Sequence, residues 1–291
     1  MLASRARSLL EPSLIAYNGY NAGLGNRVRV VLGAKALAEA EERQFLFVWP
    51  TGRLFGPDFS DLWRFEGTTI PRAVSRAMAR WYPYVDETLT WLDDDKRTER
   101  VWQIRTGSPL AQLPGVRPWQ DELRALELVP EVQRAVTSFY DEHLRGHPYV
   151  GVMIRAHANQ HARTREASPV EWFVRRMTEI ARDQPGTRFY VSCDVPEVQE
   201  RVVATVPGCV GQRDKGAFNS VEGVRAALCD VYLLACAGYL IAPYYSSFVH
   251  LSEHLSGDVL VAETSLAGRT GGVDVVSAGT ARDPLRPYER S

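Results

Sequence analysis

Lysine is scarce in this sequence, and so is any surplus of charge. Only three lysines, Lys35, Lys96 and Lys215, stand among 34 Lys and Arg residues, and 35 Asp and Glu residues leave a formal net charge of −1. Without a basic surplus, neither nucleic acid nor a membrane surface is the expected partner. The arginine bias is typical of a GC-rich bacterial genome, and arginine also suits two-pronged contacts to phosphate.

Cysteine is scarce too, and long apolar runs are missing. The cysteines follow no CxxC spacing, so we expect reduced thiols in the core rather than disulfides or a metal knuckle. They are Cys193, Cys209, Cys229 and Cys236. The first twenty residues hold no apolar run of signal-peptide length, and no stretch approaches a membrane span. These features lead us to expect a cytoplasmic protein.

Length and composition indicate a globular chain of two domains. The 291 residues are 45% hydrophobic and 24% charged, with 17 prolines, 22 glycines and no biased tract. We expect an N-terminal domain over 1–147 and a C-terminal domain over 148–265, joined near Gly146. The tail, 266–291, is expected to fray or to cross back to the first domain.

The first half contains one regular unit. Residues 14–49 have the pattern of a strand, a glycine-rich loop over Gly19–Asn26, a helix and a second strand. From there to about residue 135 the pattern is irregular, apart from helical spacing over 119–145. The expected fold of this half is therefore α/β, with its middle unassigned.

Strands and helices alternate throughout the second half. Strands are predicted at 149–154, 188–192, 209–211, 238–242 and 259–261, and helices at 169–182, 196–205, 221–236 and from 246 onward. Such alternation predicts a parallel sheet with helices on both faces. Ligands of open α/β sheets bind beyond the carboxyl ends of the strands, so the loops that follow the strands are the candidates.

Two of these loops offer an anion site. The glycine-rich loop ends Gly23-Leu-Gly25-Asn26-Arg27 at the start of a helix, where backbone N–H groups can meet a phosphate. It lacks the third glycine of a dinucleotide motif and the GK[ST] of a P-loop, so a tight turn without a ligand is the alternative. Arg155 follows strand 149–154. There its guanidinium could bind a diphosphate through two hydrogen bonds or form a surface salt bridge.

Two further loops follow later strands. Asp194 precedes Pro196, a pattern that favours a helix cap. Tyr245, Ser246 and Ser247 follow strand 238–242, where hydroxyls and helix N–H groups converge as an anion site, with a plain N-cap at Ser246 as the alternative. Three anion-friendly loops in one chain point to a diphosphate ligand.

Taken in order, these segments resemble the fucosyltransferase superfamily, which includes the α-1,6-fucosyltransferases, the nodulation fucosyltransferases and the protein O-fucosyltransferases. The segments are Gly23–Arg27 with Trp49-Pro50, Val150–Arg155, Tyr190–Asp194, Asn219–Asp230 and Ser246-Ser247. On this basis the chain is identified as a divergent bacterial member.

The resemblance implies the GT-B fold, in which two Rossmann-like domains face a cleft. By this resemblance the first domain, 1–147, lies on the acceptor side and the second, 148–265, binds the nucleotide sugar. It also implies an inverting, metal-independent transfer from a nucleoside diphosphate sugar, with GDP favoured, fucose or a related deoxyhexose or hexose as the sugar, and no cofactor. By position, Arg155 is implied as the catalytic residue that meets the β-phosphate and stabilises the departing diphosphate.

A set of donor-binding residues is implied as well. It comprises Gly23, Gly25, Asn26 and Arg27 in the first domain, and His157, Asp194, Asn219, Asp230, Tyr245, Ser246 and Ser247 in the second. Met153 stands where a histidine usually reads guanine, and Ala156 where a second basic residue is common. His157 is placed to supply the missing group. No carboxylate lies in the glycine loop, so the general base is not identified.

Competing patterns keep other functions open. His250-Leu-Ser-Glu253-His254 fits the inverted zinc-peptidase motif, and Asp93-Asp94-Asp95 contains the DxD of manganese-dependent glycosyltransferases. Both are short enough to recur by accident, and we expect no metal. A non-catalytic nucleotide-sugar-binding protein is the third alternative. The acceptor stays open among a saccharide, a peptide and a secondary metabolite, as does the oligomeric state.

Overall fold

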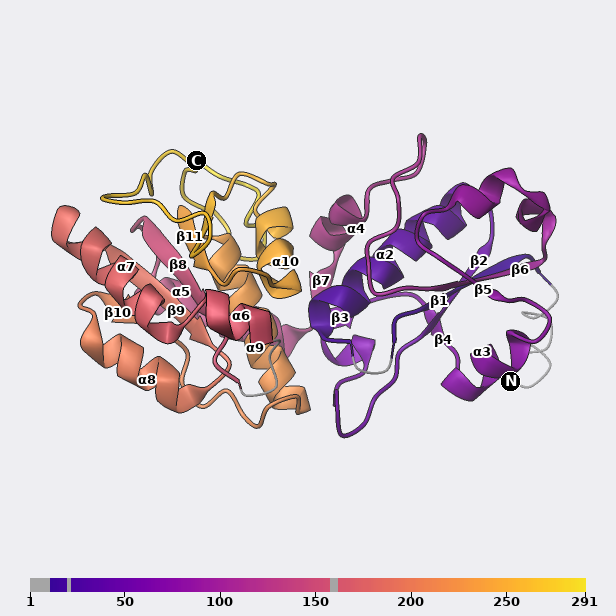
Figure 1. Ribbon diagram of the computed structural model, residues 1–291, viewed down its shortest axis with the longest axis horizontal. Helices are drawn as coiled ribbons and strands as arrows, with labels where there is room; N and C mark the ends of the chain where they lie inside the picture. Colours follow the sequence, from indigo (N-terminus) through magenta and orange to yellow (C-terminus); the bar gives the residue numbers. More distant parts are fainter. Residues whose placement is uncertain (1–10, 20–21, 158–161) are drawn as a thin grey trace. The chain divides into compact units, whose positions relative to one another are not determined.

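The computed structural model describes residues 11–19, 22–157 and 162–291, which divide into two compact units (Figure 1). The first unit is Met1–Leu128 and the second Val129–Ser291. Each is built around a five-stranded sheet in which every pairing is parallel. The predicted α/β class is confirmed.

The first unit opens with the expected strand, loop, helix and strand. These are β1 (Ser13–Tyr17), α2 (Leu24–Ala40) and β2 (Gln44–Val48). The sheet order is β4-β2-β1-β6-β5. The elements that the sequence pattern did not predict are β3 (Trp63–Arg64), β4 (Thr68–Thr69), α3 (Arg72–Met78), β5 (Tyr84–Val85), β6 (Val101–Arg105) and the short 3₁₀ turns at 59–61, 90–93 and 95–98.

The second unit follows the predicted alternation closely. Its strands are β8 (Tyr149–Ile154), β9 (Arg188–Cys193), β10 (Cys209–Val210), β11 (Tyr239–Ala242) and β12 (Ala262–Thr264). Its helices are α5 (Pro130–His143), α6 (Ala162–Ala167), α7 (Val170–Asp183), α8 (Pro196–Thr205), α9 (Val221–Ala235) and α10 (Ser247–Leu255). The sheet order β10-β9-β8-β11-β12 is that of a Rossmann fold.

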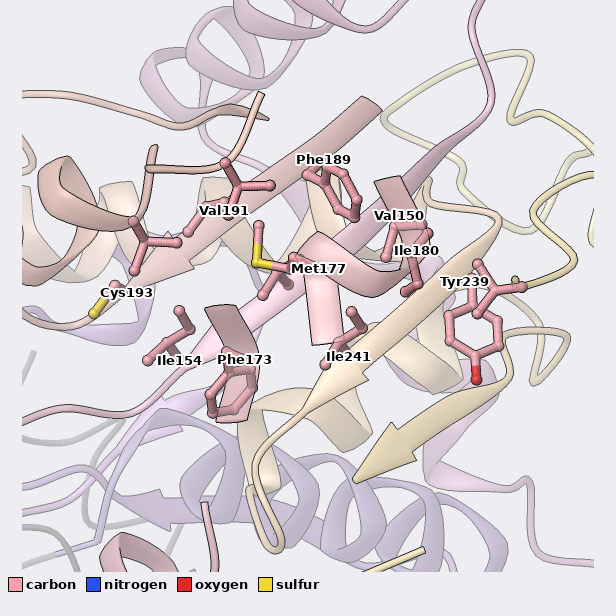
Figure 2. Close-up of a cluster of buried hydrophobic side chains, with 14 residues drawn as sticks. Val150, Ile154, Phe173, Met177, Ile180, Phe189, Val191, Cys193, Tyr239 and Ile241 are labelled. Carbon is pink, nitrogen blue, oxygen red and sulfur yellow. The ribbon is translucent and has the colours of Figure 1, made fainter. Parts of the chain in front are cut away.

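Burial on both faces explains why the strands of this sheet read as continuous apolar runs. All six residues of β8 are buried, and Phe173, Met177 and Ile180 of α7 pack against β8 and β9 (Figure 2). Gly151 lies in the middle of β8, where an added Cβ would come within 3.1–3.2 Å of Leu234, Leu240 and Ala237. Glycine is therefore set there by the close approach of α9 and β11.

Three predicted boundaries differ from the structure. The helical spacing over 119–145 breaks into α4 (Trp119–Ala125), β7 (Glu127–Leu128) and α5. Pro130 disfavours a helical backbone at Val129, which is extended, and opens α5 at its first position. The units divide before α5, which packs on α9 of the second unit, whereas the predicted division followed residue 147. The last strand begins at Ala262 rather than at 259, after the positive φ of Gly257 and Asp258.

The four thiols are free, as the spacing predicts. Cys193, Cys229 and Cys236 are buried and Cys209 is half-buried. Burial raises the pKa of Cys193, of Cys209 and of Cys236 to about 12 in each case, since the thiolate would lose its hydration. Within the described ranges, no helix has both the length and the apolar character needed to span a bilayer.

The tail is anchored within the second unit through a buried ion pair. Arg176 of α7 donates through Nε to Glu263 Oε1 at 2.8 Å, and both side chains are at most 3% exposed. Arg176 also donates to the carbonyl of Gly271 at 2.6 Å, and Glu263 accepts from the Arg269 backbone N–H at 3.1 Å. Farther along, Arg290 donates to the carbonyl of Ala237 at 3.0 Å. These contacts hold the tail on the domain that precedes it.

Removing one partner of this pair should destabilise the protein. Glu263→Ala leaves the Arg176 guanidinium buried with part of its charge uncompensated, and we expect the free energy of unfolding to fall by about 3 kcal/mol. Urea denaturation followed by circular dichroism measures the loss. Glu200→Ala, at an exposed position of α8, is the matched control and should stay within ~0.5 kcal/mol of the parent. Equal stability of the two variants would contradict the anchoring role.

Candidate functional site

The order of strands marks one edge of the second sheet as the place for a ligand. From β8 the chain moves outward through β9 and β10, then returns to the other side of β8 for β11 and β12. The carboxyl ends of β8 and β11 therefore flank the point where the order reverses, the usual ligand position in such sheets. Arg155 follows β8 directly, and α10 begins shortly after β11.

The Asp194 carboxylate shapes the loop that follows β8. Its Oδ1 accepts from the backbone N–H of Ala156 at 2.6 Å and of His157 at 3.1 Å. The predicted helix cap at Asp194 is thus wrong: Val195 occupies the N-cap of α8 without a side-chain cap, although Pro196 does open the helix. Asp194 instead ties the ends of β8 and β9 together, which leaves its loop fixed beside Arg155.

Arg155 is held loosely enough to serve a ligand. Its Nε lies 3.8 Å from Asp194 Oδ2, longer than a hydrogen bond, and 36% of the side chain is exposed. The same Nε is buried and has no hydrogen-bond partner among the described residues. A guanidinium in this state can still offer its donors to an anion.

The start of α10 supplies the second half of this edge. Ser246 is buried, and its Oγ accepts from the Phe248 backbone N–H at 3.2 Å, so the N-cap alternative holds for this serine. Ser247 is the first helical residue. Tyr245 is 51% exposed, and its ring meets that of His250 edge-on at 5.8 Å. The positive end of the helix dipole and its N–H groups favour an anion here.

Asp230 is a buried hub rather than an open ligand contact. Both carboxylate oxygens are occupied, and the residue is 3% exposed. Its donors are Ser192 Oγ at 2.7 Å, Gln212 Nε2 at 2.5 Å, Lys215 Nζ at 2.7 Å and the Tyr190 hydroxyl. A carboxylate has about four acceptor positions, and these donors fill them. The structure thus gives Asp230 a role within the protein, and its predicted contact with the donor stays a prediction.

Lys215 and Gln212 were missed by sequence reasoning, although they complete this hub. Lys215 also donates to Gln199 Oε1 at 2.7 Å, so one ammonium links α9, α8 and the segment that precedes α9. The signal was present, since Lys215 is one of three lysines in an arginine-rich chain. A compact ammonium fits a small buried space that a planar guanidinium does not.

The segment before α9 carries the next predicted residue, Asn219. Its φ of 62° lies in the left-handed region that asparagine tolerates, and it precedes the Ser220 N-cap, whose Oγ accepts from Gly223 N at 3.0 Å. Next to it, the Phe218 ring is exposed and stacks on His157 with centroids 4.2 Å apart and planes 11° from parallel. The structure thereby brings the Arg155 loop and the Asn219 turn together.

In the first unit, the described part of the glycine loop leaves open space at the start of α2. Tyr20 and Asn21 lie outside the described residues. Gly23 occupies the N-cap without a side-chain cap, and an added Cβ would meet no atom within 4 Å. Gly25 is buried in the first turn, and the buried Asn26 Oδ1 has no partner among the described residues. The backbone N–H groups at a helix N-terminus suit an anion, whereas the Asn26 amide oxygen can only accept and suits a hydroxyl or amide donor of a ligand.

Arg27 does not face this space. It is 1% exposed, and it donates through Nε to the Ala22 carbonyl at 2.7 Å and through Nη1 to the Pro50 carbonyl at 2.6 Å. Its Cζ also lies 4.2 Å from the centre of the Phe55 ring. In this geometry the Arg27 guanidinium holds the glycine loop to the end of β2, and its predicted contact with the donor stays a prediction.

The competing metal motifs gain no support. The His, Cys, Asp and Glu side chains of the described ranges form no group of three or more that could hold a metal ion. His254 Nδ1 lies 2.6 Å from Asp258 Oδ1, outside the HxxEH pattern. The aspartates at 93–95 are exposed and sit at the junction of two 3₁₀ turns.

The comparisons with known proteins agree with the geometry of the sheets. No known family model and no curated protein matches the sequence. Among solved structures, the fucosyltransferase NodZ from Bradyrhizobium has a TM-score of 0.57 at 16% identity, covering 84% of this chain and 92% of that one. One further NodZ structure was soaked with GDP-fucose.

Two other fucosyltransferase structures are similar over most of the chain. A mutant of Arabidopsis thaliana FUT1 in complex with GDP has a TM-score of 0.56 at 15% identity, covering 97% of this chain and 77% of that one. POFUT1 in complex with GDP has a TM-score of 0.51 at 12% identity, with 86% and 98% covered. At such identities the likeness establishes the fold, and the chain has the GT-B fold of these fucosyltransferases.

The Asp230 hub generates a stability prediction. Asp230→Asn keeps the shape of the side chain but leaves the Lys215 ammonium without its anion, and we expect the free energy of unfolding to fall by about 3 kcal/mol. Chemical denaturation measures it. Asp214→Asn, at the exposed neighbour of Lys215, is the matched control and should change stability by less than ~0.5 kcal/mol. If Asp230→Asn leaves the free energy of unfolding unchanged, the hydrogen bonds of this hub do not stabilise the protein.

Proposed function

We propose that the protein is an inverting, metal-independent glycosyltransferase that moves fucose or a related sugar from a GDP donor to an acceptor. The observation that supports this most directly is the pairing of Arg155 with the N-terminus of α10 at the order reversal of the second sheet. A strand-end guanidinium and a helix N-terminus are complementary to a diphosphate. The GT-B fold shared with GDP-bound fucosyltransferases favours GDP.

In the proposed mechanism the second unit stabilises the leaving group. The acceptor hydroxyl attacks the anomeric carbon from the side opposite the diphosphate, and the new C–O bond forms as the bond to the phosphate oxygen breaks. The acceptor hydroxyl passes its proton to solvent water, and GDP departs with the bond electrons. Arg155 and the α10 N–H groups compensate the charge that grows on the diphosphate, so they act more strongly in the transition state than on the bound donor.

The nucleobase is proposed to lie near His157. Met153, which replaces the usual guanine-reading histidine, is buried inside β8 and has no polar hydrogen to donate. His157 lies four residues farther along the chain, in the loop after β8. It is half-buried, and its ring stacks on that of Phe218. A fixed imidazole at this position is able to bond a base edge.

The proposed function is tested first with GDP and then with a variant of Arg155. The purified chain should gain about 2.7 kcal/mol of stability when GDP is present at a hundred times its Kd. Arg155→Ala should lower kcat for GDP-fucose hydrolysis or transfer about 10²- to 10³-fold, because one preorganised donor to the leaving group is lost. Thermal shift and GDP-release assays measure both.

Arg201→Ala is the control for this experiment, since Arg201 is exposed on α8. It should keep full activity, and both variants should unfold at the temperature of the parent. GDP binding without turnover in the parent would favour the non-catalytic nucleotide-sugar-binding alternative. Full activity of Arg155→Ala would rule out the proposed role of this residue.

Ser246 offers a test that separates capping from phosphate binding. Ser246→Ala should cost about 1 kcal/mol of stability through loss of the cap, whereas glycine at an N-cap costs only a few tenths. Ser246→Gly therefore keeps α10 while removing the hydroxyl. If the hydroxyl touches the donor, both variants should weaken GDP binding in isothermal titration. Parental affinity in Ser246→Gly would assign Ser246 to capping alone.

A further inference from the structure

A cavity outside the donor loops opens at the carboxyl ends of β5 and β6 in the first unit. Its volume is about 510 Å³, within the ~300–1,000 Å³ typical of small-molecule sites. The lining residues are Tyr84, Val85, Asp86, Thr90, Trp91, Asp94, Lys96 and Arg105. They come from the two strand ends and from the turns between them, a region in which the sequence pattern showed no motif.

Arg105 is presented to this cavity by two aromatic rings. It is the last residue of β6, and its Cζ lies 5.2 Å from the centre of the Tyr17 ring and 5.4 Å from that of Tyr84. Across residues 11–19, 22–157 and 162–291, no ion pair within 4.0 Å is found for Arg105. Tyrosine faces thus orient the guanidinium while leaving its N–H donors unspent.

The turn that follows β5 forms a wall of the cavity and supplies an acceptor held in a fixed position. Asp86 Oδ1 accepts from the backbone N–H of Thr88 at 3.0 Å and from its hydroxyl at 2.6 Å. These bonds hold the pKa of Asp86 below its usual value, so the group is a carboxylate at neutral pH. Trp91 donates from Nε1 to the Asp86 carbonyl at 3.1 Å, which fixes the turn.

The backbone of this wall is strained. Leu89 has a φ of 58°, in the left-handed region that leucine rarely occupies, and its side chain is buried. Such strain persists where the surroundings over-determine the conformation, and it clusters at binding sites. The turn that carries Asp86, Thr90 and Trp91 is therefore shaped before any ligand arrives.

The cavity lies at the same sheet edge as the glycine loop. β6 pairs with β1 in register, with Tyr17 opposite Arg105. One residue farther on, the Thr106 carbonyl accepts from Asn18 Nδ2 at 3.0 Å, and Asn18 also donates to the Asn26 carbonyl at 2.9 Å. Asn18 thus links the glycine loop to the residue that follows cavity-lining Arg105 within the first unit.

We infer that this cavity is the acceptor site and that the acceptor is a saccharide, an inference that rests on the proposed function. A sugar ring presents hydroxyls that both donate and accept, together with an apolar C–H face. The walls offer cationic donors at Lys96 and Arg105, carboxylate acceptors at Asp86 and Asp94, and the ring of Tyr84 for the C–H face.

The other two acceptor classes fit this lining less well. An aromatic metabolite would need a mainly apolar wall, whereas charged and hydroxyl groups make up most of this one. A peptide would need an extended groove or a longer strand edge than β5 offers, since this edge strand has only two residues. The saccharide site also gives the aspartate run at 93–95 a role, since Asp94 serves as a hydrogen-bond acceptor and not as a metal ligand.

A printed array of neutral oligosaccharides, probed with the labelled full chain in the presence and absence of GDP, tests the inference. We expect the parent to bind a defined subset of glycans, and Arg105→Ala and Asp86→Asn each to weaken that binding at least tenfold. Arg100→Ala is the matched control, because Arg100 is exposed, precedes β6 and does not line the cavity. It should bind as the parent does.

The outcomes separate this inference from the proposed function. Arg105→Ala should keep the GDP-induced thermal shift, which reports on the donor site of the second unit, while its KM for a bound glycan rises. An array that binds nothing, or glycan binding that survives in both cavity variants, overturns the saccharide site. If the parent binds glycans but shows no thermal shift with GDP, the proposed transferase function is contradicted, while the cavity is still a saccharide site.

Discussion

Parallel pairing of β8 with β9 and β11 is the constraint on which the candidate donor site depends. In a parallel sheet all carboxyl ends lie at one edge, and a chain that returns to the opposite side of its first strand leaves a gap between two loops there. Arg155 and Ser247 are 92 positions apart in the sequence and are brought to one edge for this reason. Asp194 then fixes the loop beside Arg155 by accepting two backbone N–H groups. No single residue makes the site; its placement follows from the order of strands.

The sequence was sufficient for the architecture of the second unit and for little of the first beyond β1, α2 and β2. Buried parallel strands read as unbroken apolar runs, so β8, β9 and β11 were visible. β6 was not, because its five residues include Gln103 and Arg105, whose partners are spread along the chain. Gln103 is buried only because Ser75 and the Tyr82 carbonyl satisfy its amide. A buried polar residue of this kind interrupts the apolar pattern by which a strand is recognised in the sequence. Its burial depends on contacts with distant residues, which the pattern does not reveal.

The site residues show the same division between what a pattern locates and what a side chain does. The loops were located correctly, but three of the side chains act in ways that spacing alone does not reveal. Arg27 is buried over Phe55, Asp194 bonds a neighbouring strand end instead of its own helix, and Asp230 is filled by four donors. In each case, a long-range partner decided the role. The order of segments that resembles fucosyltransferases thus marks a framework, in which these three side chains hold loops and strand ends in place.

The buried thiols have a consequence for experiments in solution. Because Cys193, Cys229 and Cys236 are inaccessible and their pKa values are raised by burial, they are poor nucleophiles at neutral pH. A cysteine introduced on the surface of each unit would react with maleimide dyes far faster than these native thiols, with half-buried Cys209 as the one native position to replace. Single-molecule energy transfer between two such dyes would then report the separation of the units with and without added GDP, in an otherwise natural chain.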